Sequence, residues 1–558
     1  MKDADAIIIG SGIGGLATAL CLAQAGKKVI VLEQHYVPGG WCHSFYLNGF
    51  RFSPGVHFIG EMDKGAPVRE IYEGLGIAND LTFFRQNVHG YDHAYVGKER
   101  FDLPAGKDNL IQNLQALFPK ERKGIHRYVN VVDAARKELN VISELKTPLD
   151  HLLVPFKMNN LGRYALFTLE RVVSWYVKDP LLKAFLNIQC GNHGLAPNKA
   201  SFAMHAGMMG HYLGGGFYPK GGGSAIVKAF TRAIKANGGK ILTRTKVKKI
   251  LIQSVNKKAT AVGVQLADNS ALYAPQIVSN ADPGMTYGQL IDPEWLPPKL
   301  QKRLTKTTYS SPSLILFLTV KADLRQYGMD SGNIWYAEDK DLNAVYDRLL
   351  KTSPGKGERF QGMFITSPTL KDPSSFDGQH HTIEAITFTD YDHFVPFENS
   401  NSGNRPDDYL RFKEQLTEKM LRTVDHVLPG IRHKVVHCEL GTPLTNTFYI
   451  EATRGNCYGT EKILKQIGPF GYQAASPINN LFLCGASTVG HGVMGATNSG
   501  LATAVKMLGV KRPSQLLTHG EGQELKVYPA EDPSAWPDSV LQKRAVRKRR
   551  QEQQGIKF

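Results

Sequence analysis

The chain has 558 residues, of which 42% are hydrophobic and 21% charged, and a formal net charge of +17 at neutral pH. This length exceeds one compact core, so two or three intertwined domains are expected, and the composition excludes disordered and fibrous classes. The positive charge favours nucleic acid or anionic lipid as a partner, although a generally basic proteome would give the same value. Because no nucleic-acid-binding module is recognisable, we expect an anionic membrane surface and no nucleic acid.

Residues 5–44 carry the pattern on which the rest of the chain depends. A β-branched apolar run at residues 6–9 leads into Gly10, Gly12, Gly14 and Gly15, and an Ala/Leu-rich helical stretch follows at once. Gly10 permits a tight turn, Gly12 lets the backbone approach a pyrophosphate, and Gly15 lets the helix pack closely on the strand. The helix N-terminus offers free N–H groups and a positive dipole end to phosphates. This order of strand, glycine turn and helix predicts a dinucleotide site.

A second strand-like run, residues 28–32, ends in Glu33. The acid follows the glycine turn by about twenty residues, where a carboxylate accepts hydrogen bonds from ribose hydroxyls. An acid at this place disfavours a 2′-phosphate, so NADP is not expected.

Four runs of the sequence carry a family resemblance: Leu32-Glu33-Gln34-His35, Gly39-Gly40-Trp41-Cys42-His43-Ser44-Phe45, Asn48-Gly49-Phe50-Arg51-Phe52 and Gly55-Val56-His57-Phe58-Ile59-Gly60. With these runs the sequence resembles the retinol saturase branch of the phytoene-desaturase-like FAD oxidoreductases, a superfamily that also holds carotenoid desaturases and carotenoid cis–trans isomerases. Two departures stand out: Trp41 replaces an Arg that reaches the pyrophosphate in many members, and Ser53 replaces an Asp that many members have.

A glycine-rich motif near the carboxyl end, residues 480–496, matches the same superfamily. A strand is expected to end at Gly485 and a helix to cover residues 496–508. The resemblance implies that the N-terminus of this helix lies beneath a flavin ring, and that the glycine pair after Glu33 marks the cofactor as FAD rather than NAD. It implies backbone contact of Val247 with adenine. The complete set of cofactor-binding residues implied is Gly10, Gly12, Gly14, Gly15, Glu33, Gln34, Gly39, Gly40, Ser44, Val56, Val247, Gly485, Gly492, Val493 and Met494.

The expected fold class is α/β, with a Rossmann-type, amine-oxidase-like FAD-binding domain, an interleaved mixed β-sheet substrate domain and a helical membrane-facing subdomain. The FAD-binding domain is assigned to residues 1–90, 216–290 and 441–512, the helical lid to 91–215, the β-rich substrate domain to 291–440, and a basic C-terminal tail to 513–558. Within the substrate domain, residues 313–320, 362–366 and 381–389 are predicted strands of an antiparallel sheet, followed by a helix over 406–427.

The helical region contains an unusual segment, residues 152–177, in which apolar and aromatic residues alternate with Lys and Arg. An interfacial helix that dips into a bilayer and a buried lid over the substrate would both look like this. No uninterrupted apolar run approaches the ~18 residues of a membrane span, and residues 1–5 lead directly into the first strand. The expected location is cytoplasmic and peripherally membrane-associated.

The remaining signals concern cysteines and the basic tail. Six scattered cysteines without CxxC spacing indicate a reducing compartment and neither a disulfide framework nor a metal site. Residues 543–550 contain a basic cluster that would bind anionic lipid or lie solvated in a tail.

The predicted function follows from the resemblance and from flavin chemistry. FAD adds or removes hydrogen across a carbon–carbon bond, so we expect an oxidoreductase that saturates or isomerises an apolar polyene lipid, a carotenoid or a retinoid. His57 and Tyr458 are the candidate catalytic residues, although a structural histidine and a packing tyrosine remain open. Alternatives are carotenoid desaturation, amine oxidation, and a prenyl-binding chaperone of the same fold without chemistry. The electron donor or acceptor stays unassigned, since no second nucleotide-binding motif is evident.

Overall fold

The protein is described here by a computed structural model that covers residues 2–142, 158–353, 355–538 and 540. Its first sheet is parallel and contains five strands in the order β19-β13-β1-β2-β9. β1, β2 and β13 are buried throughout, as expected for short apolar strands covered on both faces. The strands are β1 (Ala6–Ile9), β2 (Val29–Leu32), β9 (Lys240–Leu242), β13 (Ile277–Ser279) and β19 (Leu481–Leu483).

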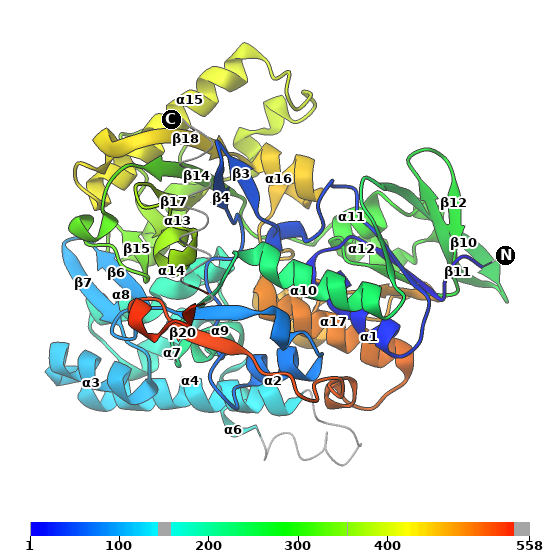
Figure 1. Ribbon diagram of the computed structural model, residues 1–558, viewed down its shortest axis with the longest axis horizontal. Helices are drawn as coiled ribbons and strands as arrows, with labels where there is room; N and C mark the ends of the chain where they lie inside the picture. Colours follow the sequence, from blue (N-terminus) through cyan, green and yellow to red (C-terminus); the bar gives the residue numbers. More distant parts are fainter. Residues whose placement is uncertain (1, 143–157, 354, 539, 541–558) are drawn as a thin grey trace.

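Helices and a small sheet cover the two faces of this parallel sheet. Helix α1 (Ile13–Gln24) packs between α10 (Gly223–Ala236) and α17 (Gly492–Leu508), as Figure 1 shows. Apolar side chains of the other face pack on an antiparallel sheet of three strands. These strands are β10 (Val247–Val255), β11 (Lys258–Leu266) and β12 (Ala271–Tyr273).

The substrate-side sheet has seven strands in the order β18-β14-β17-β16-β15-β6-β7. Its strands are β6 (Asp92–Val96), β7 (Glu99–Leu103), β14 (Ser313–Val320), β15 (Asn333–Ala337), β16 (Gly362–Thr366), β17 (His381–Phe388) and β18 (Val435–Gly441). The sheet is mixed, because β6 pairs parallel with β15 while the other neighbours are antiparallel. The predicted strands at 313–320, 362–366 and 381–389 are antiparallel neighbours, and the sheet as a whole is mixed, as expected.

The strand β6 was not predicted because it begins with two polar residues, Asp92 and His93, both fully buried. Their burial is offset by partners: Asp92 accepts hydrogen bonds from Gln189 and Asn333, each at 2.7 Å. The strand and its neighbour β7 come from the segment assigned to the helical lid. The domain boundaries themselves stay a prediction.

Four helices accompany the seven-stranded sheet or join it to the cofactor side: α13 (Leu342–Lys351), α14 (Pro368–Lys371), α15 (Asp407–Val427) and α16 (Pro443–Ile450). Two more, α11 (Pro283–Gly288) and α12 (Pro298–Leu304), follow β13. The predicted helix over 406–427 is thus confirmed as α15. The predicted helix at 496–508 is α17, which begins earlier, at Gly492.

The segment beyond residue 512 is more folded than the predicted tail. Strand β20 (Lys526–Pro529) pairs parallel with β5 (Thr82–Arg85), which also pairs with β8 (Phe217–Pro219). Trp536 is buried and lies on Phe84, with ring centroids 5.1 Å apart. This apolar packing holds the segment against the rest of the protein. The basic cluster at 543–550 lies outside the described residues. A short hairpin, β3 (Phe45–Leu47) and β4 (Phe50–Phe52), and α2 (Pro67–Gly74) complete the fold.

The helical region forms a bundle at the lower edge of Figure 1. It contains α3 (Lys107–Leu117), α4 (Arg122–Ile142), α6 (Asn159–Tyr164), α7 (Leu169–Tyr176), α8 (Pro180–Asn187) and α9 (Phe202–Tyr212). The described part of the 152–177 segment is two short helices, α6 and α7, rather than one interfacial helix, and residues 152–157 lie outside the described residues. Among the helices that the structure describes, none combines the length and apolarity needed to cross a bilayer.

Candidate functional site

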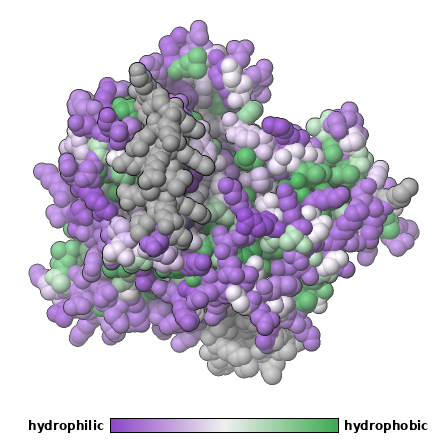
Figure 2. Space-filling view, viewed as in Figure 1, coloured by the Kyte–Doolittle hydropathy of each residue, from purple (hydrophilic) through white to green (hydrophobic). Residues whose placement is uncertain are grey.

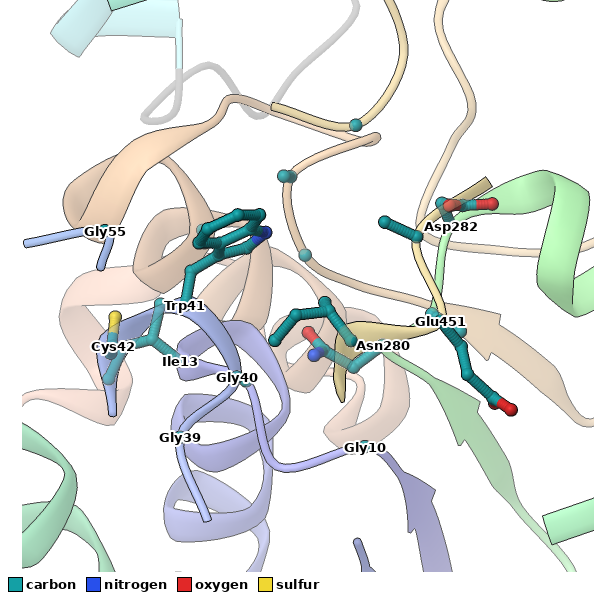
Figure 3. A pocket seen from close by; sticks show the side chains of 18 of the residues that line it. Gly10, Ile13, Gly39, Gly40, Trp41, Cys42, Gly55, Asn280, Asp282 and Glu451 are labelled. Carbon is teal, nitrogen blue, oxygen red and sulfur yellow. The ribbon is translucent and has the colours of Figure 1, made fainter. Parts of the chain in front are cut away.

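A large cavity opens at the carboxyl ends of the parallel strands, where ligands of doubly wound folds bind. Figure 3 shows Gly39, Gly40 and Trp41 on one side of it and Asn280 and Asp282 on the other. The cavity extends from the end of β2 to the edge of the seven-stranded sheet. It is lined by residues of nine separate segments: 9–14, 32–43, 54–57, 245–247, 280–290, 313–315, 386–388, 449–459 and 484–496.

Close backbone packing explains the glycines of the first turn. A Cβ atom on Gly15 would lie 2.3 Å from the carbonyl oxygen of Gly10, and one on Gly14 would lie 2.8 Å from the backbone nitrogen of Gly485. Gly10 has φ +89°, a conformation that other residues rarely adopt. The first and last glycine motifs of the sequence therefore meet in one place.

The N-terminus of α1 faces the cavity. The first N–H groups of a helix have no acceptor within the helix. The N–H of Gly15 donates to Asn280 Oδ1 at 3.0 Å, and Ile13 and Gly14 line the cavity in front of it. This arrangement of backbone donors at a positive dipole end suits a phosphate group.

Glu33 is held rigidly at the end of β2. Its Oε2 accepts hydrogen bonds from the backbone N–H of Ser11 at 2.9 Å and from the Ser11 hydroxyl at 2.5 Å, and its Oε1 accepts one from the N–H of His35 at 2.8 Å. Ser11 Oγ in turn accepts from the N–H of Gly39 at 3.0 Å. Each carboxylate oxygen accepts about two hydrogen bonds, so Oε1 keeps room for a ribose hydroxyl.

A second, mainly apolar cavity meets the first. Four residues line both cavities and mark their junction: His57, Ile386, Phe388 and Tyr458. The second cavity runs between β15, β16, β17 and α13, and it is lined beyond the junction by Ile188, Gly191, Asn192, Trp335, Tyr336, Ala337, Leu342, Val345, Tyr346, Leu349, Gly362, Met363, Phe364 and Thr387. Such a lining suits an apolar molecule.

The two candidate catalytic residues both lie at this junction. The Nδ1 atom of His57 lies 3.1 Å from Glu384 Oε2. Tyr458 is partly buried, its ring centroid lies 5.0 Å from that of His491, and desolvation raises the pKa of its phenol well above the ordinary value. Tyr458 therefore stays neutral at physiological pH, whereas His57 has a carboxylate partner.

Eleven of the residues assigned to the cofactor line the first cavity: Gly10, Gly12, Gly14, Glu33, Gln34, Gly39, Gly40, Val247, Gly485, Gly492 and Val493. Four do not: Gly15, Ser44, Val56 and Met494. Gly15 packs against Gly10. The Ser44 hydroxyl accepts from the N–H of Ser224 at 3.2 Å at the start of α10, Val56 lies in the core, and Met494 packs against the same core on α17.

Asn280 and Asp282 were not predicted as site residues. Asn280 follows β13 and contacts both glycine motifs, and a Cβ atom on Gly12 would lie 2.5 Å from its Nδ2. Asp282 caps α11, where its Oδ1 accepts from Met285 N at 3.0 Å and its Oδ2 from Thr453 N at 2.8 Å. The one feature of the sequence that could have indicated them as site residues is their position directly after a strand of the parallel sheet. Among described residues, no group of three or more His, Cys, Asp or Glu could hold a metal ion.

The glycine turn, the Glu33 carboxylate and the free helix N-terminus are the features of a dinucleotide-binding protein. The apolar second cavity, which meets the cofactor cavity, is the place for a substrate, as in a flavoenzyme. The family of flavin-containing amine oxidoreductases matches residues 13–508, and the chain belongs to this family. Its cofactor is FAD, for which the space in front of Gly12 and Gly14 and the Glu33 carboxylate are suited.

Relatives of known activity cover most of the chain. The chain is 31% identical to human all-trans-retinol 13,14-reductase and 30% to the zebrafish (Danio rerio) protein of that name, over 90% of this chain and 85% of each relative. It is 27% identical to the chloroplastic prolycopene isomerase of Daucus carota, over 92% of this chain and 82% of the relative. These matches confirm the predicted family branch.

Solved structures show the same fold at low sequence identity. An oxidoreductase from Methanosarcina mazei is 19% identical with a TM-score of 0.60, covering 91% of this chain and 100% of its own. Putrescine oxidase bound to putrescine is 15% identical with a TM-score of 0.60, covering 91% and 99%. The predicted amine-oxidase-like α/β fold is confirmed.

Proposed function

We propose that this protein is an FAD-dependent oxidoreductase that saturates or isomerises a carbon–carbon double bond of an apolar polyene lipid. The observation that carries the proposal is the apolar second cavity, which meets the cofactor cavity at His57 and Tyr458. Two groups of relatives, retinol reductases and prolycopene isomerases, are named for polyene chemistry. A retinoid or a carotenoid is therefore the expected substrate class.

FAD supplies a hydride or single electrons to a carbon–carbon bond, and the chain supplies the surroundings. The N–H groups of Ile13 and Gly14 would bind phosphate, and Glu33 would accept ribose hydroxyls. The remaining cavity-lining residues among those assigned above would complete the cofactor site. Residues Trp335, Phe364 and their neighbours would exclude water from the reacting bond.

The apolar lining of the chamber favours a side chain over bulk water as the source of the proton for saturation. His57 and Tyr458 are titratable residues that line both cavities, and we assign proton transfer to His57 because its imidazole contacts a carboxylate. Tyr458, as a neutral phenol at the same junction, would pack against the substrate or the ring.

The test is anaerobic incubation of the reduced holoenzyme with all-trans-retinol, and separately with all-trans and cis carotenoids, with products resolved by chromatography and mass. A gain of two hydrogens identifies a saturase, and a new isomer of unchanged mass identifies an isomerase. Absence of turnover on every polyene, or release of peroxide with amines in air, would contradict the proposal and favour amine oxidation.

We further propose that the substrate arrives from a membrane surface at the helical bundle. Leu166 is 71% exposed and Trp175 46% exposed. Arg171 lies over the rings of Phe167 and Trp175, with its guanidinium carbon 5.0 and 5.9 Å from the ring centroids. Aromatic residues beside arginine suit the headgroup region of a bilayer.

Vesicle sedimentation tests this membrane contact. The protein is expected to sediment with vesicles that contain phosphatidylserine, and the paired variant Leu166→Ser/Trp175→Ser is expected to bind several-fold less. Leu410→Ser, a half-exposed site on α15, is the matched control. Equal binding by all three proteins would contradict a contact at α6 and α7.

A further inference from the structure

The loop of residues 53–57 is clamped from behind by two buried side chains. Glu384, in the middle of β17, accepts a hydrogen bond from the N–H of Ser53 on Oε1 at 2.6 Å, and its Oε2 lies 3.1 Å from Nδ1 of His57. Lys371 Nζ donates to the carbonyl oxygen of His57 at 2.5 Å. Both ends of the loop are thus fixed, and Pro54, Gly55 and His57 line the cofactor cavity.

Both clamping side chains are fully buried, and their charges are offset locally. Lys371 Nζ also donates to Asn333 Oδ1, and the Asn333 amide donates to Asp92. Burial lowers the pKa of Lys371 to about 7, while Glu384 and Asp92 favour its ammonium form. Burial raises the pKa of Asp92 to about 6. Glu384 is the acid that contacts the His57 ring directly, and Lys371 is the basic group that contacts the His57 carbonyl oxygen.

The hydrogen bonds fix the orientation of the imidazole. An ionised carboxylate only accepts hydrogen bonds, so the proton between the two side chains belongs to Nδ1 of His57. The other ring nitrogen, Nε2, is then the one left for the junction of the two cavities. Nε2 is therefore the ring nitrogen that can exchange a proton with the substrate.

We infer that Glu384 is a positioning residue that makes His57 the proton donor to the polyene, with Nδ1–H held by the carboxylate and Nε2–H facing the reacting double bond. The inference rests on the proposed function and adds the side chain that orients its proton donor. FAD bound in its reduced form would supply the hydride that one carbon of the double bond takes as the π bond breaks. The neighbouring carbon takes the Nε2 proton of the imidazolium, the electrons of that N–H bond stay on the ring, and the resulting neutral imidazole regains a proton from solvent after the product has left.

The first test is Glu384→Gln, which keeps the size of the side chain and an oxygen for Ser53. The glutamine amide would donate to Nδ1, so the ring would carry its proton on Nε2 in the neutral form and lose its anionic partner. We expect kcat for polyene saturation to fall by about 100-fold or more, within the usual contribution of a general acid, with KM and FAD content unchanged. The alkaline limb of the pH profile of kcat is expected to move to lower pH.

A second readout does not depend on activity. Nitrogen-15 NMR of protein labelled at histidine rings reports the tautomer, and the His57 signal is identified by its loss in His57→Gln. We expect Nδ1–H in the wild-type protein and Nε2–H in Glu384→Gln. The His57→Gln variant also serves if Glu384→Gln does not fold, since it is expected to show the same loss of kcat.

The matched control is Glu61→Gln. His211 Nδ1 lies 3.1 Å from Glu61 Oε2, the same spacing as in the His57 pair, but neither Glu61 nor His211 lines either of the two cavities described above. The control is expected to leave kcat and the His57 signal unchanged. An unchanged tautomer in Glu384→Gln, or a kcat within threefold of wild type, would overturn the inference. If the wild-type product has unchanged mass, the donor role of His57 is overturned but the proposed function stands. If no polyene is turned over, the proposed function is refuted, and the NMR measurement of the His57 tautomer still tests the role of Glu384.

Discussion

The cofactor end and the substrate end of this protein are built in different ways. At the cofactor end, the glycine turn, Glu33 and Gly39 come from about thirty consecutive residues, and all except the Glu33 carboxylate act through backbone atoms. At the substrate end, His57, Lys371, Glu384 and Tyr458 come from segments far apart in the chain and act through side chains. A site built from backbone atoms needs particular residues close together in the sequence, which makes it recognisable there. A site built from side chains of distant segments depends on how the strands pair, which the sequence does not show.

The largest expected effect is at the first glycine turn. In Gly15→Ala the new Cβ would lie 2.3 Å from the oxygen of Gly10, a clash that has to move the helix or the turn at a cost of about 1–3 kcal/mol. We expect most of the bound FAD to be lost, measured as visible flavin absorbance per protein, together with a lower thermal midpoint. Gly162→Ala, where nothing lies within 4 Å of the new atom, should keep its FAD. Full flavin content in Gly15→Ala would contradict this account of the turn.

The next effect concerns the acid of the cofactor end. Glu33→Gln replaces a charged acceptor of three hydrogen bonds, and hydrogen bonds to charged groups contribute about 1.5–3 kcal/mol. The dissociation constant of FAD, measured by titration of the apoprotein, is expected to rise about 10- to 100-fold. Glu451→Gln is the control, because that side chain pairs with Lys246 at the same cavity; its effect should stay below threefold. Equal effects of the two substitutions would refute a special role of Glu33.

At the substrate end, a larger side chain in the second cavity should affect substrate binding without affecting cofactor binding. Val345 lines that cavity and not the first, so Val345→Phe should raise the KM for the polyene about tenfold, the effect of one lost apolar subsite, and leave the FAD content unchanged. Val436→Phe, at an exposed position of β18, should change neither. Loss of FAD without a change in KM would place the substrate elsewhere.

The smallest effect is a pH dependence of stability. The pKa of Lys371 is about 7 in the folded protein because of burial and about 10.4 in an unfolded chain. Between these values the unfolded state binds the extra proton, so this lysine makes stability increase as pH rises from 7 towards 9. In Lys371→Met that increase should shrink by about 1–3 °C of thermal midpoint. Parallel curves for variant and wild type over this range would contradict a buried, readily deprotonated lysine.

The sequence predicted the cofactor end in detail because its signals are local. The strand at residues 6–9, the glycine turn and Glu33 follow one another within a single strand–helix–strand unit, and the structure places Gly10 and Glu33 at one cavity. The strands at 313–320 and 362–366 were also predicted, since they are short apolar runs.

The substrate end could be predicted only in part. His57 was noticed through its motif, but Glu384 lies in an apolar strand pattern and Lys371 in a polar loop sequence, and neither has a neighbour in sequence that indicates its partner. Their meeting depends on the pairing of β17 with β14 and β16 and on the position of α14. The strand β6 was missed for a related reason, because Asp92 is buried only by virtue of its partners.

The most direct test of the central claim is a visible difference spectrum of the oxidised holoenzyme titrated with all-trans-retinol, which absorbs at shorter wavelengths than the flavin band. If the two cavities meet as described, the polyene contacts the flavin and perturbs its visible band in a saturable manner, and Val345→Phe weakens the titration. A polyene that binds, as shown by its own absorption, while the flavin band stays unchanged would contradict the account.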